Sequence, residues 1–234
     1  MASRAHNAHP KRRTNEAAEN YAKAIYELQA KGERAVGTKA VAERLGVTTG
    51  SASGMLKRLA EEGVVEYEPY RGARLTPEGE RIALEMIRHH RLIELFLAEV
   101  LEMPWDRVHS EAEVLEHHIS EELEELIAAK LGQPRRDPHG DPIPDRDLEV
   151  TTEDSVALSE LEPGERGVFA RVSDSDSSML RYLAEREIQP GDGLVVSSRE
   201  PFGGPVMVEI AGRIHPLGAQ LAESIRVQRK SDDE

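Results

Sequence analysis

The chain contains no cysteine and a single tryptophan, and aromatic residues make up only 4% of its 234 residues. The lack of cysteine excludes disulfides, thiol chemistry and metal centres built on thiolate ligands. No apolar stretch is long enough to cross a membrane, and the basic first residues are not followed by the apolar run of a signal peptide. We therefore expect a cytoplasmic protein. With 38% hydrophobic and 32% charged residues, the chain can bury a core.

Charge is distributed unevenly along the chain, whose formal net charge is −14. Residues 1–75 hold 13 Lys and Arg against 9 Asp and Glu, whereas residues 76–234 hold 17 against 35. A basic N-terminal third on an acidic body favours contact with a polyanion through that third alone. A chance distribution of charge would explain the same numbers, so the motifs have to decide.

The sequence up to residue 76 has the pattern of a winged helix-turn-helix. Apolar spacing predicts three helices, over 16–31, 38–46 and 48–63, each closed by a glycine, with Thr38 as the cap of the second. Two β-type runs around a Pro/Gly turn then predict a hairpin, the wing. Residues 1–15 lack any periodicity and are interpreted as a flexible arm.

The middle of the chain is predicted to be helical. Pro77 begins a helix that we expect to reach about Leu101, and its apolar surface is larger than one stripe requires, which is typical of an oligomer interface. A second helix is predicted from about Ser110 to Leu131. Residues 133–150, with four prolines, are interpreted as a connector.

The last third reads as a small β-domain. Four short β-type runs, 167–172, 193–197, 206–210 and 224–227, are separated by Gly/Pro turns and predict a small barrel. One helix, from Ser177 to about Glu187, interrupts it. The expected architecture is mainly α with small β, divided into an arm (1–15), a DNA-binding domain (16–76), a helical domain (77–146) and a C-terminal domain (147–234).

The third predicted helix has the composition of a DNA-reading helix. Its first turns carry small hydroxyl side chains flanked by Gly50 and Gly54, and long base-reading side chains are absent. We therefore expect phosphate contacts and DNA shape to provide much of the specificity. Alternatively, the hydroxyls only cap the helix and the winged fold binds a protein. The candidate DNA-binding residues are Thr38, Lys39, Thr48, Thr49, Ser51, Ser53, Lys57, Arg58, Arg71 and Arg74.

A metal-ligand pattern lies on the two central helices. His90 and Glu94 are four residues apart on the first, and a His/Glu set on the second has the spacing i, i+4, i+7 and i+8, which is one helical face. Imidazole nitrogens and carboxylate oxygens from two helices suit a divalent first-row metal. Alternatively, these residues form a solvent-exposed acidic helix face without a metal, and the histidines lie there by chance. The second set is His109, Glu113, Glu116 and His117.

The same residues could in principle activate water, as in a metallohydrolase. We find no obvious nucleophile, oxyanion hole or phosphate-binding glycine loop, and residues 201–205 read as a hairpin turn. The sequence therefore does not predict an enzyme.

Taken in order, the motifs resemble the diphtheria-toxin-repressor family of metal-dependent transcriptional regulators, which includes iron-dependent and manganese-transport regulators. The resemblance spans about residues 16–230 and implies a winged helix, a helical dimerisation and metal-binding domain, and a C-terminal SH3-like (FeoA-like) domain. The matching stretches are Tyr21–Leu28, Val47–Leu59, Tyr70–Thr76, Arg88–Leu92, Val108–His118 and Pro138–Pro144.

The resemblance also implies roles for the candidate ligands. His90, Glu94 and His109 match the family's ancillary metal site, whereas Glu113, Glu116 and His117 match the helix part of its regulatory site. A ligand from the third domain is expected in the ancillary site of iron-type members, and Asp174 and Asp176 are its candidates here.

The first helix departs from the pattern of the family. Asn20 stands where relatives have a Met or Asp ligand, and its carbonyl oxygen can still bind metal. Lys23 stands where manganese-type members have Glu, and a lysine cannot bind metal near neutral pH. The regulatory site thus holds either one ion or two, a question that the sequence leaves open.

Glu113 occupies the position of a cysteine in iron-type members and a glutamate in manganese-type members. A hard carboxylate in place of a soft thiolate favours Mn(II) over Fe(II), although other divalent first-row metals can also bind. The expected function is a homodimeric repressor of metal-ion homeostasis, which binds an operator when metal ties its DNA-binding domain to the dimerisation core. The alternative is a metal sensor that acts through a protein partner.

Overall fold

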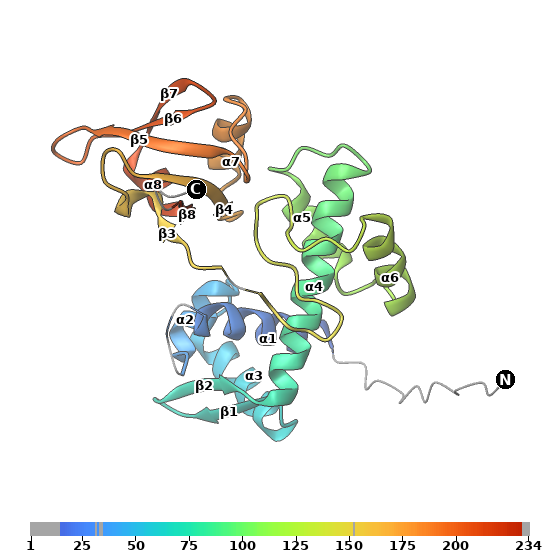
Figure 1. Ribbon diagram of the computed structural model, residues 1–234. Helices are drawn as coiled ribbons and strands as arrows, with labels where there is room; N and C mark the ends of the chain where they lie inside the picture. Colours follow the sequence, from blue (N-terminus) through green and yellow to red (C-terminus); the bar gives the residue numbers. More distant parts are fainter. Residues whose placement is uncertain (1–14, 31, 33–34, 152, 231–234) are drawn as a thin grey trace. The chain divides into compact units, whose positions relative to one another are not determined.

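The computed structural model describes residues 15–30, 32, 35–151 and 153–230. The chain divides into two compact units, residues 1–86 and residues 87–234, and the boundary falls inside the long helix α4 (Pro77–Glu99) (Figure 1). The predicted arm lies outside the described residues, except for its last residue, Asn15.

The first unit contains the predicted helices and hairpin. Ile25, Leu56 and Leu59 are fully buried in its core, one from the first helix and two from the third. These positions carry the apolar spacing on which the helices were predicted. The elements are α1 (Glu16–Gln29), α2 (Thr38–Arg44), α3 (Thr49–Glu61), β1 (Val65–Glu68) and β2 (Gly72–Leu75).

Helix caps place the starts of these helices. The side chain of Asn15 accepts a hydrogen bond from the backbone N–H of Ala18, and Thr48 does the same for Ser51. Helix α2 is capped by Gly37, because Thr38 already has helical backbone. The prediction that Thr38 is the cap was therefore wrong by one residue.

The wing is fastened to the start of α2. Val36 and Ala73 exchange two backbone hydrogen bonds of 2.8 Å, so the residues before α2 form a third, one-residue rung beside β2. Gly72 makes this approach possible, since its φ is +99° and a Cβ there would lie 2.4 Å from the carbonyl oxygen of Val36.

Two helices follow α4, so the single helix predicted over 110–131 was wrong. Helix α5 (Val108–Leu115) ends at Glu116, and helix α6 (Glu121–Lys130) begins after Ser120, whose hydroxyl accepts a hydrogen bond from the N–H of Leu123. Apolar residues keep a four-residue spacing across the break, which merged the two helices in the sequence pattern.

A buried ion pair joins α6 to α4. The guanidinium of Arg88 donates to the carboxylate of Glu124 and to the carbonyl oxygen of Pro144, and both charged side chains are at most 10% exposed. The other carboxylate oxygen of Glu124 lies 2.9 Å from Nε2 of His89. The pair fixes the relative position of the two helices.

The connector at residues 133–150 is a chain of turns that lies against the C-terminal domain. The backbone N–H of Val172, in strand β4 (Arg166–Val172), donates to the carbonyl oxygen of His139. Gly140 allows this contact, since its φ is +90° and a Cβ there would lie 2.1 Å from the carbonyl oxygen of Ala170.

The C-terminal domain is built on a six-stranded antiparallel sheet with the order β3-β8-β4-β5-β6-β7. The four predicted runs are present as strands. Strand β7, the short β3 and helix α8 were not predicted. Beside β4, the elements are β3 (Val156–Ala157), the 3₁₀ turn η1 (Leu158–Glu160), α7 (Ser177–Ala184), β5 (Gly193–Arg199), β6 (Val206–Ile210), β7 (Arg213–Leu217), α8 (Ala219–Ser224) and β8 (Ile225–Arg229).

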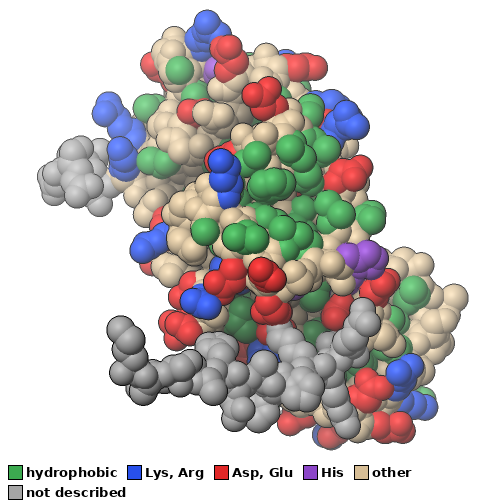
Figure 2. Space-filling model, turned by 90° about the vertical axis from the view of Figure 1, so that its right-hand side faces the viewer, with side chains coloured by type: hydrophobic (Ala, Val, Ile, Leu, Met, Phe, Trp, Pro, Cys, Tyr) green, Lys and Arg blue, Asp and Glu red, His purple; other side chains and the backbone are tan. Residues whose placement is uncertain are grey.

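Hydrophobic side chains gather on the side of the second unit that faces the viewer in Figure 2, where α5 and α6 lie. Among the large apolar side chains that remain exposed are Val114 and Leu115 on α5 and Leu123 and Leu126 on α6. Such a patch is typical of a protein interface. Among the described residues, no helix is both long and apolar enough to cross a membrane.

Candidate metal centre and nucleic-acid interface

Two imidazoles and two carboxylates converge between α4, the start of α5 and the loop before α7. Oε1 of Glu94 lies 3.0 Å from Nε2 of His90 and 3.2 Å from Nδ1 of His109. The same His109 nitrogen lies 3.0 Å from Oδ2 of Asp174. One ligand atom from each of the four residues lies within 4.8 Å of the others. The structure thus brings together the three residues predicted for the ancillary site and Asp174, one of the two candidates from the third domain.

The charged groups of this cluster shift one another's pKa values. Burial alone would raise the pKa of Glu94, but the imidazoles of His109, His139 and His90 hold it well below its usual value. The carboxylates of Asp174 and Glu94 raise the pKa of His109 to about 10. The protonated imidazole of His109 thus balances the carboxylates of Asp174 and Glu94.

A second cluster lies around the other ring nitrogen of His90, Nδ1. Nδ1 of His90 lies 2.5 Å from Oε2 of Glu116 and 3.9 Å from Oε1 of Glu113. His117, the remaining predicted regulatory ligand, lies beside this cluster, with Nε2 3.7 Å from Oε1 of Glu116. His90 therefore faces both groups of ligands. Since a neutral imidazole offers one lone pair, it can ligate in only one cluster at a time.

A third cluster was missed by the sequence reasoning. Glu94, Asp137 and His139 are all buried and bring one ligand atom each within 4.8 Å of one another. Oε2 of Glu94 and Nδ1 of His139 are 3.8 Å apart, and neither atom has a hydrogen-bond partner among the described residues. Nε2 of His139 donates to the carbonyl oxygen of Trp105, so once the ring is neutral its lone pair lies on Nδ1. Two buried acceptor atoms without a hydrogen-bond partner among the described residues, Oε2 of Glu94 and Nδ1 of His139, fit a bound cation.

Burial and neighbouring charges also shift the other two groups of this cluster. Burial among the carboxylates of Glu94 and Asp141 raises the pKa of Asp137 to about 7. For His139, burial alone would lower the pKa, but Glu94 and Asp137 raise it to about 9. Asp137 is held in place by the backbone N–H groups of His139 and Asp141, at 2.8 and 2.9 Å.

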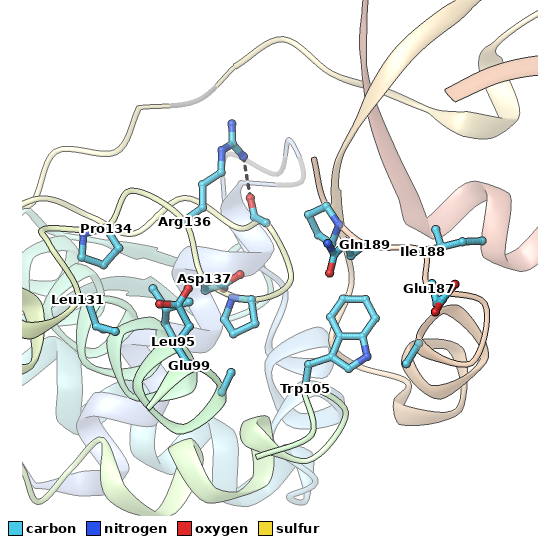
Figure 3. Close-up of a pocket in the computed structure, with 15 residues that line it drawn as sticks. Leu95, Glu99, Trp105, Leu131, Pro134, Arg136, Asp137, Glu187, Ile188 and Gln189 are labelled. Atoms are coloured by element: carbon cyan, nitrogen blue, oxygen red, sulfur yellow. Dashed lines mark hydrogen bonds between the residues drawn. The ribbon is translucent and has the colours of Figure 1, made fainter. Parts of the chain in front are cut away.

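Trp105 and Asp137 line a pocket of about 640 Å³ (Figure 3). The ring of Trp105 stacks on the imidazole of His139, and its Nε1 donates to the carbonyl oxygen of Leu180 in α7. In Figure 3, Trp105 lies between Leu95 and Asp137 on one wall and residues 187–189 on the other. The tryptophan thus links His139 of the connector to the C-terminal domain.

The structure distinguishes the two aspartates proposed from the C-terminal domain. Asp174 contacts His109, whereas Asp176 caps α7 by accepting a hydrogen bond of 2.9 Å from the N–H of Ser178. Asn20 and Lys23 lie on α1, in the first unit. The role of Asn20 as a ligand to a site on the second unit stays a prediction.

The predicted DNA-binding side chains lie on α2, α3 and the wing. Several of the charged ones are exposed and lie beside a carboxylate: Lys39 with Glu43, Arg58 with Glu62 and Arg71 with Glu68. Thr48 uses its hydroxyl to cap α3, as the alternative interpretation expected, and also lies 2.9 Å from the hydroxyl of Ser51. Thr49, Lys57 and Arg74 are exposed. Thr38 and Ser53 both contact the hydroxyl of Tyr67.

Comparison with known proteins places each part of the chain. Residues 13–73 match the N-terminal DNA-binding domain of iron-dependent repressors, residues 76–145 match their metal-binding and dimerisation domain, and residues 156–229 match the FeoA domain. The chain belongs to the diphtheria-toxin-repressor family. This result confirms the predicted fold class, including the SH3-like C-terminal domain.

Full-length relatives agree. The diphtheria toxin repressor of Corynebacterium glutamicum is 34% identical over 222 residues, which are 90% of this chain and 95% of that protein. The iron-dependent repressor IdeR of Mycobacterium leprae is 27% identical over 90% of this chain and 96% of its own. A manganese-dependent transcriptional repressor solved with manganese is 43% identical, with a TM-score of 0.84 over 91% of this chain and all of that one.

The chain is therefore a metal-dependent, DNA-binding transcriptional repressor and not an enzyme, as the sequence predicted. Its relatives include iron-dependent and manganese-dependent repressors, which confirms the predicted class of co-repressor. The matched dimerisation domain contains the exposed apolar patch of α5 and α6. The individual ligands, the DNA contacts and the domain boundaries stay predictions.

Proposed function

We propose that Mn(II) activates this repressor in preference to Fe(II). We also propose that the repressor binds a near-palindromic operator as a homodimer and so controls genes of metal-ion homeostasis. The observation that carries the preference is the donor set. Every candidate ligand is an imidazole nitrogen or an oxygen, and Glu113 supplies a carboxylate where iron-type members have a thiolate. Hard oxygen donors suit Mn(II). The manganese-bound relative supports the same preference.

In this proposal the two groups of ligands have different tasks. Glu113, Glu116 and His117, with Asn20 from α1, hold the regulatory ion, which links the DNA-binding unit to the dimerisation core. His90, Glu94, His109 and Asp174 hold the ancillary ion, while Asp137 and His139 lie beside it at the other oxygen of Glu94. When the imidazoles lose their protons, the buried carboxylates have no positive charge beside them. A bound divalent cation would supply that charge.

The chain's own residues prepare the ancillary position. Oε1 of Glu94 contacts the imidazoles of His90 and His109, and Oε2 faces the imidazole of His139. One buried carboxylate therefore orients three imidazoles. Asp174 belongs to the C-terminal domain, and His139 belongs to the connector that lies against it. Metal at this position therefore fastens that domain to the helical core.

The preference is tested by measuring DNA binding by fluorescence anisotropy at buffered concentrations of Mn(II), anaerobic Fe(II) and Zn(II). We expect Mn(II) to activate the wild type, and Glu113→Cys to shift the response toward Fe(II) and Zn(II). Glu111→Cys, on the exposed side of α5, is the matched control and keeps the wild-type order. Equal shifts in both variants would contradict the role of Glu113. Absence of DNA binding with every metal would favour a sensor that acts through a protein partner.

A further inference from the structure

One hydroxyl group joins three elements of the DNA-binding unit: β1, α2 and α3. The side chain of Tyr67, on β1, places its oxygen 3.1 Å from Oγ of Ser53 on α3 and 3.3 Å from Oγ1 of Thr38 at the start of α2. These two hydroxyls lower the pKa of the Tyr67 phenol, Ser53 more than Thr38. The ring of Tyr67 packs against the core of the unit, and this packing fixes the position of the hydroxyl.

The position of Tyr67 in the wing is also fixed by the backbone. Tyr67 lies opposite Ala73 in the β1–β2 register, and Ala73 is the residue that exchanges two hydrogen bonds with Val36 before α2. The wing is thus attached to α2 through its backbone at Ala73. It contacts α3 through a hydrogen bond between the hydroxyls of Tyr67 and Ser53.

We propose that Tyr67 is a positioning residue for DNA recognition, whose hydroxyl fixes the angle between the DNA-reading helix α3 and the wing. A winged helix reads a site by placing its recognition helix in a groove while the wing contacts the flanking backbone. Both sets of contacts form together only if the helix and the wing keep their relative orientation. The hydroxyl of Tyr67 supplies this constraint at the middle of α3.

This role separates Tyr67 from the residues that contact DNA. Lys57, Arg58 and Arg71 are exposed and able to reach phosphates, which gives binding that is independent of sequence. Loss of the Tyr67 hydroxyl leaves these charges in place. It therefore weakens binding to a preferred sequence, where several contacts must form at once, more than binding to unrelated DNA.

The test compares Tyr67→Phe with the wild type, both in the presence of Mn(II). The specific probe is the duplex that the wild type selects from a random-sequence library, and the non-specific probe is a scrambled duplex of the same composition. We expect roughly three- to tenfold weaker binding to the selected duplex, which is the loss of about one hydrogen bond, and nearly unchanged binding to the scrambled one. Tyr182→Phe is the matched control, because it removes a tyrosine hydroxyl bonded to the carbonyl oxygen of Pro216 in the C-terminal domain.

A second variant addresses the partner of the hydroxyl. If Tyr67 acts through Ser53, the double variant Tyr67→Phe with Ser53→Ala binds the selected duplex no more weakly than the worse single variant. Should Tyr67→Phe fail to fold, Ser53→Ala breaks the same bond from the other side. An unchanged ratio of specific to non-specific affinity overturns the proposal. An equal loss on both duplexes, together with a lower melting temperature, also overturns it. A wild type that selects no duplex with any metal would instead contradict the operator proposal.

Discussion

Metal binding at the ancillary position should release protons, and the number follows from the structure. In the metal-free protein the pKa of His109 is about 10 and that of His139 about 9, so both imidazoles are protonated at pH 7.5. A cation bound to His109 and Glu94 displaces the proton of His109 and neutralises the carboxylate that holds the proton on His139, so both protons are released. Asp137, with a pKa of about 7, adds a fraction of a third near pH 7.

The expected size of the effect is large. Two protons released per filled centre make the apparent affinity rise about 100-fold for each pH unit between roughly pH 7 and 8.5, which is about 2.7 kcal/mol per unit. The sign follows from the raised pKa values, because the protonated imidazoles compete with metal at neutral pH and cease to compete only above about pH 10. Binding therefore tightens as the pH increases.

Trp105 makes the measurement direct. It is the only tryptophan in the sequence and stacks on His139, with ring centroids 5.6 Å apart, so its fluorescence should report Mn(II) bound beside it. A Glu113→Ala background weakens the other cluster. Calorimetry in two buffers with different heats of protonation then counts the protons released.

Asp174→Asn is the informative variant in this experiment. The Asp174 carboxylate is the main cause of the raised pKa of His109, so its loss should reduce the count from about two protons toward one. A count near zero in the parent protein, or affinity that does not change with pH, would refute the reasoning. Either result would mean that these imidazoles are not ligands or carry no proton before metal binds.

Three further predictions concern the scaffold. Glu124→Gln leaves the buried guanidinium of Arg88 without its counter-charge and should destabilise the fold by about 3–5 kcal/mol, measured by urea unfolding; a change below 1 kcal/mol would contradict the importance of this pair. Leu126→Asp introduces charge into the exposed patch of α6, and light scattering should then find monomers instead of dimers. Gly140→Ala cannot keep both its φ of +90° and its contact with Ala170, so hydrogen exchange of β4 should accelerate, whereas unchanged exchange would show that the connector is not held there.

Local patterns were enough to predict the DNA-binding unit. The helices of residues 16–63 have both apolar periodicity and caps, such as Asn15 and Thr48, which lie within a few residues of what they stabilise. The same reasoning failed at Ser120, where a cap interrupts an apolar pattern that continues into the next helix. Strand β7 was missed because its pairing with β6 depends on a tight turn at Ala211 and Gly212, both with positive φ.

The candidate metal centre divides in the same way. His90 and Glu94 lie one helical turn apart, and this spacing made them visible in the sequence. Asp137 and His139 lie in a proline-rich connector without periodicity, and only the packing of that connector against Trp105 and β4 brings them to Glu94. The signal that could have identified them was the Pro138–Pro144 stretch, which was noticed only as a match to the family.

The central claim is that metal and DNA bind to this repressor with positive coupling. The most direct test measures both halves of the cycle: the affinity for the selected duplex with Mn(II) and with chelator, and the affinity for Mn(II) with and without that duplex. We predict the same factor in both directions, about 5- to 150-fold, or about 1–3 kcal/mol. Equal affinity for DNA with chelator and with Mn(II) would contradict the account and leave a DNA-binding protein whose His/Glu clusters only support its fold.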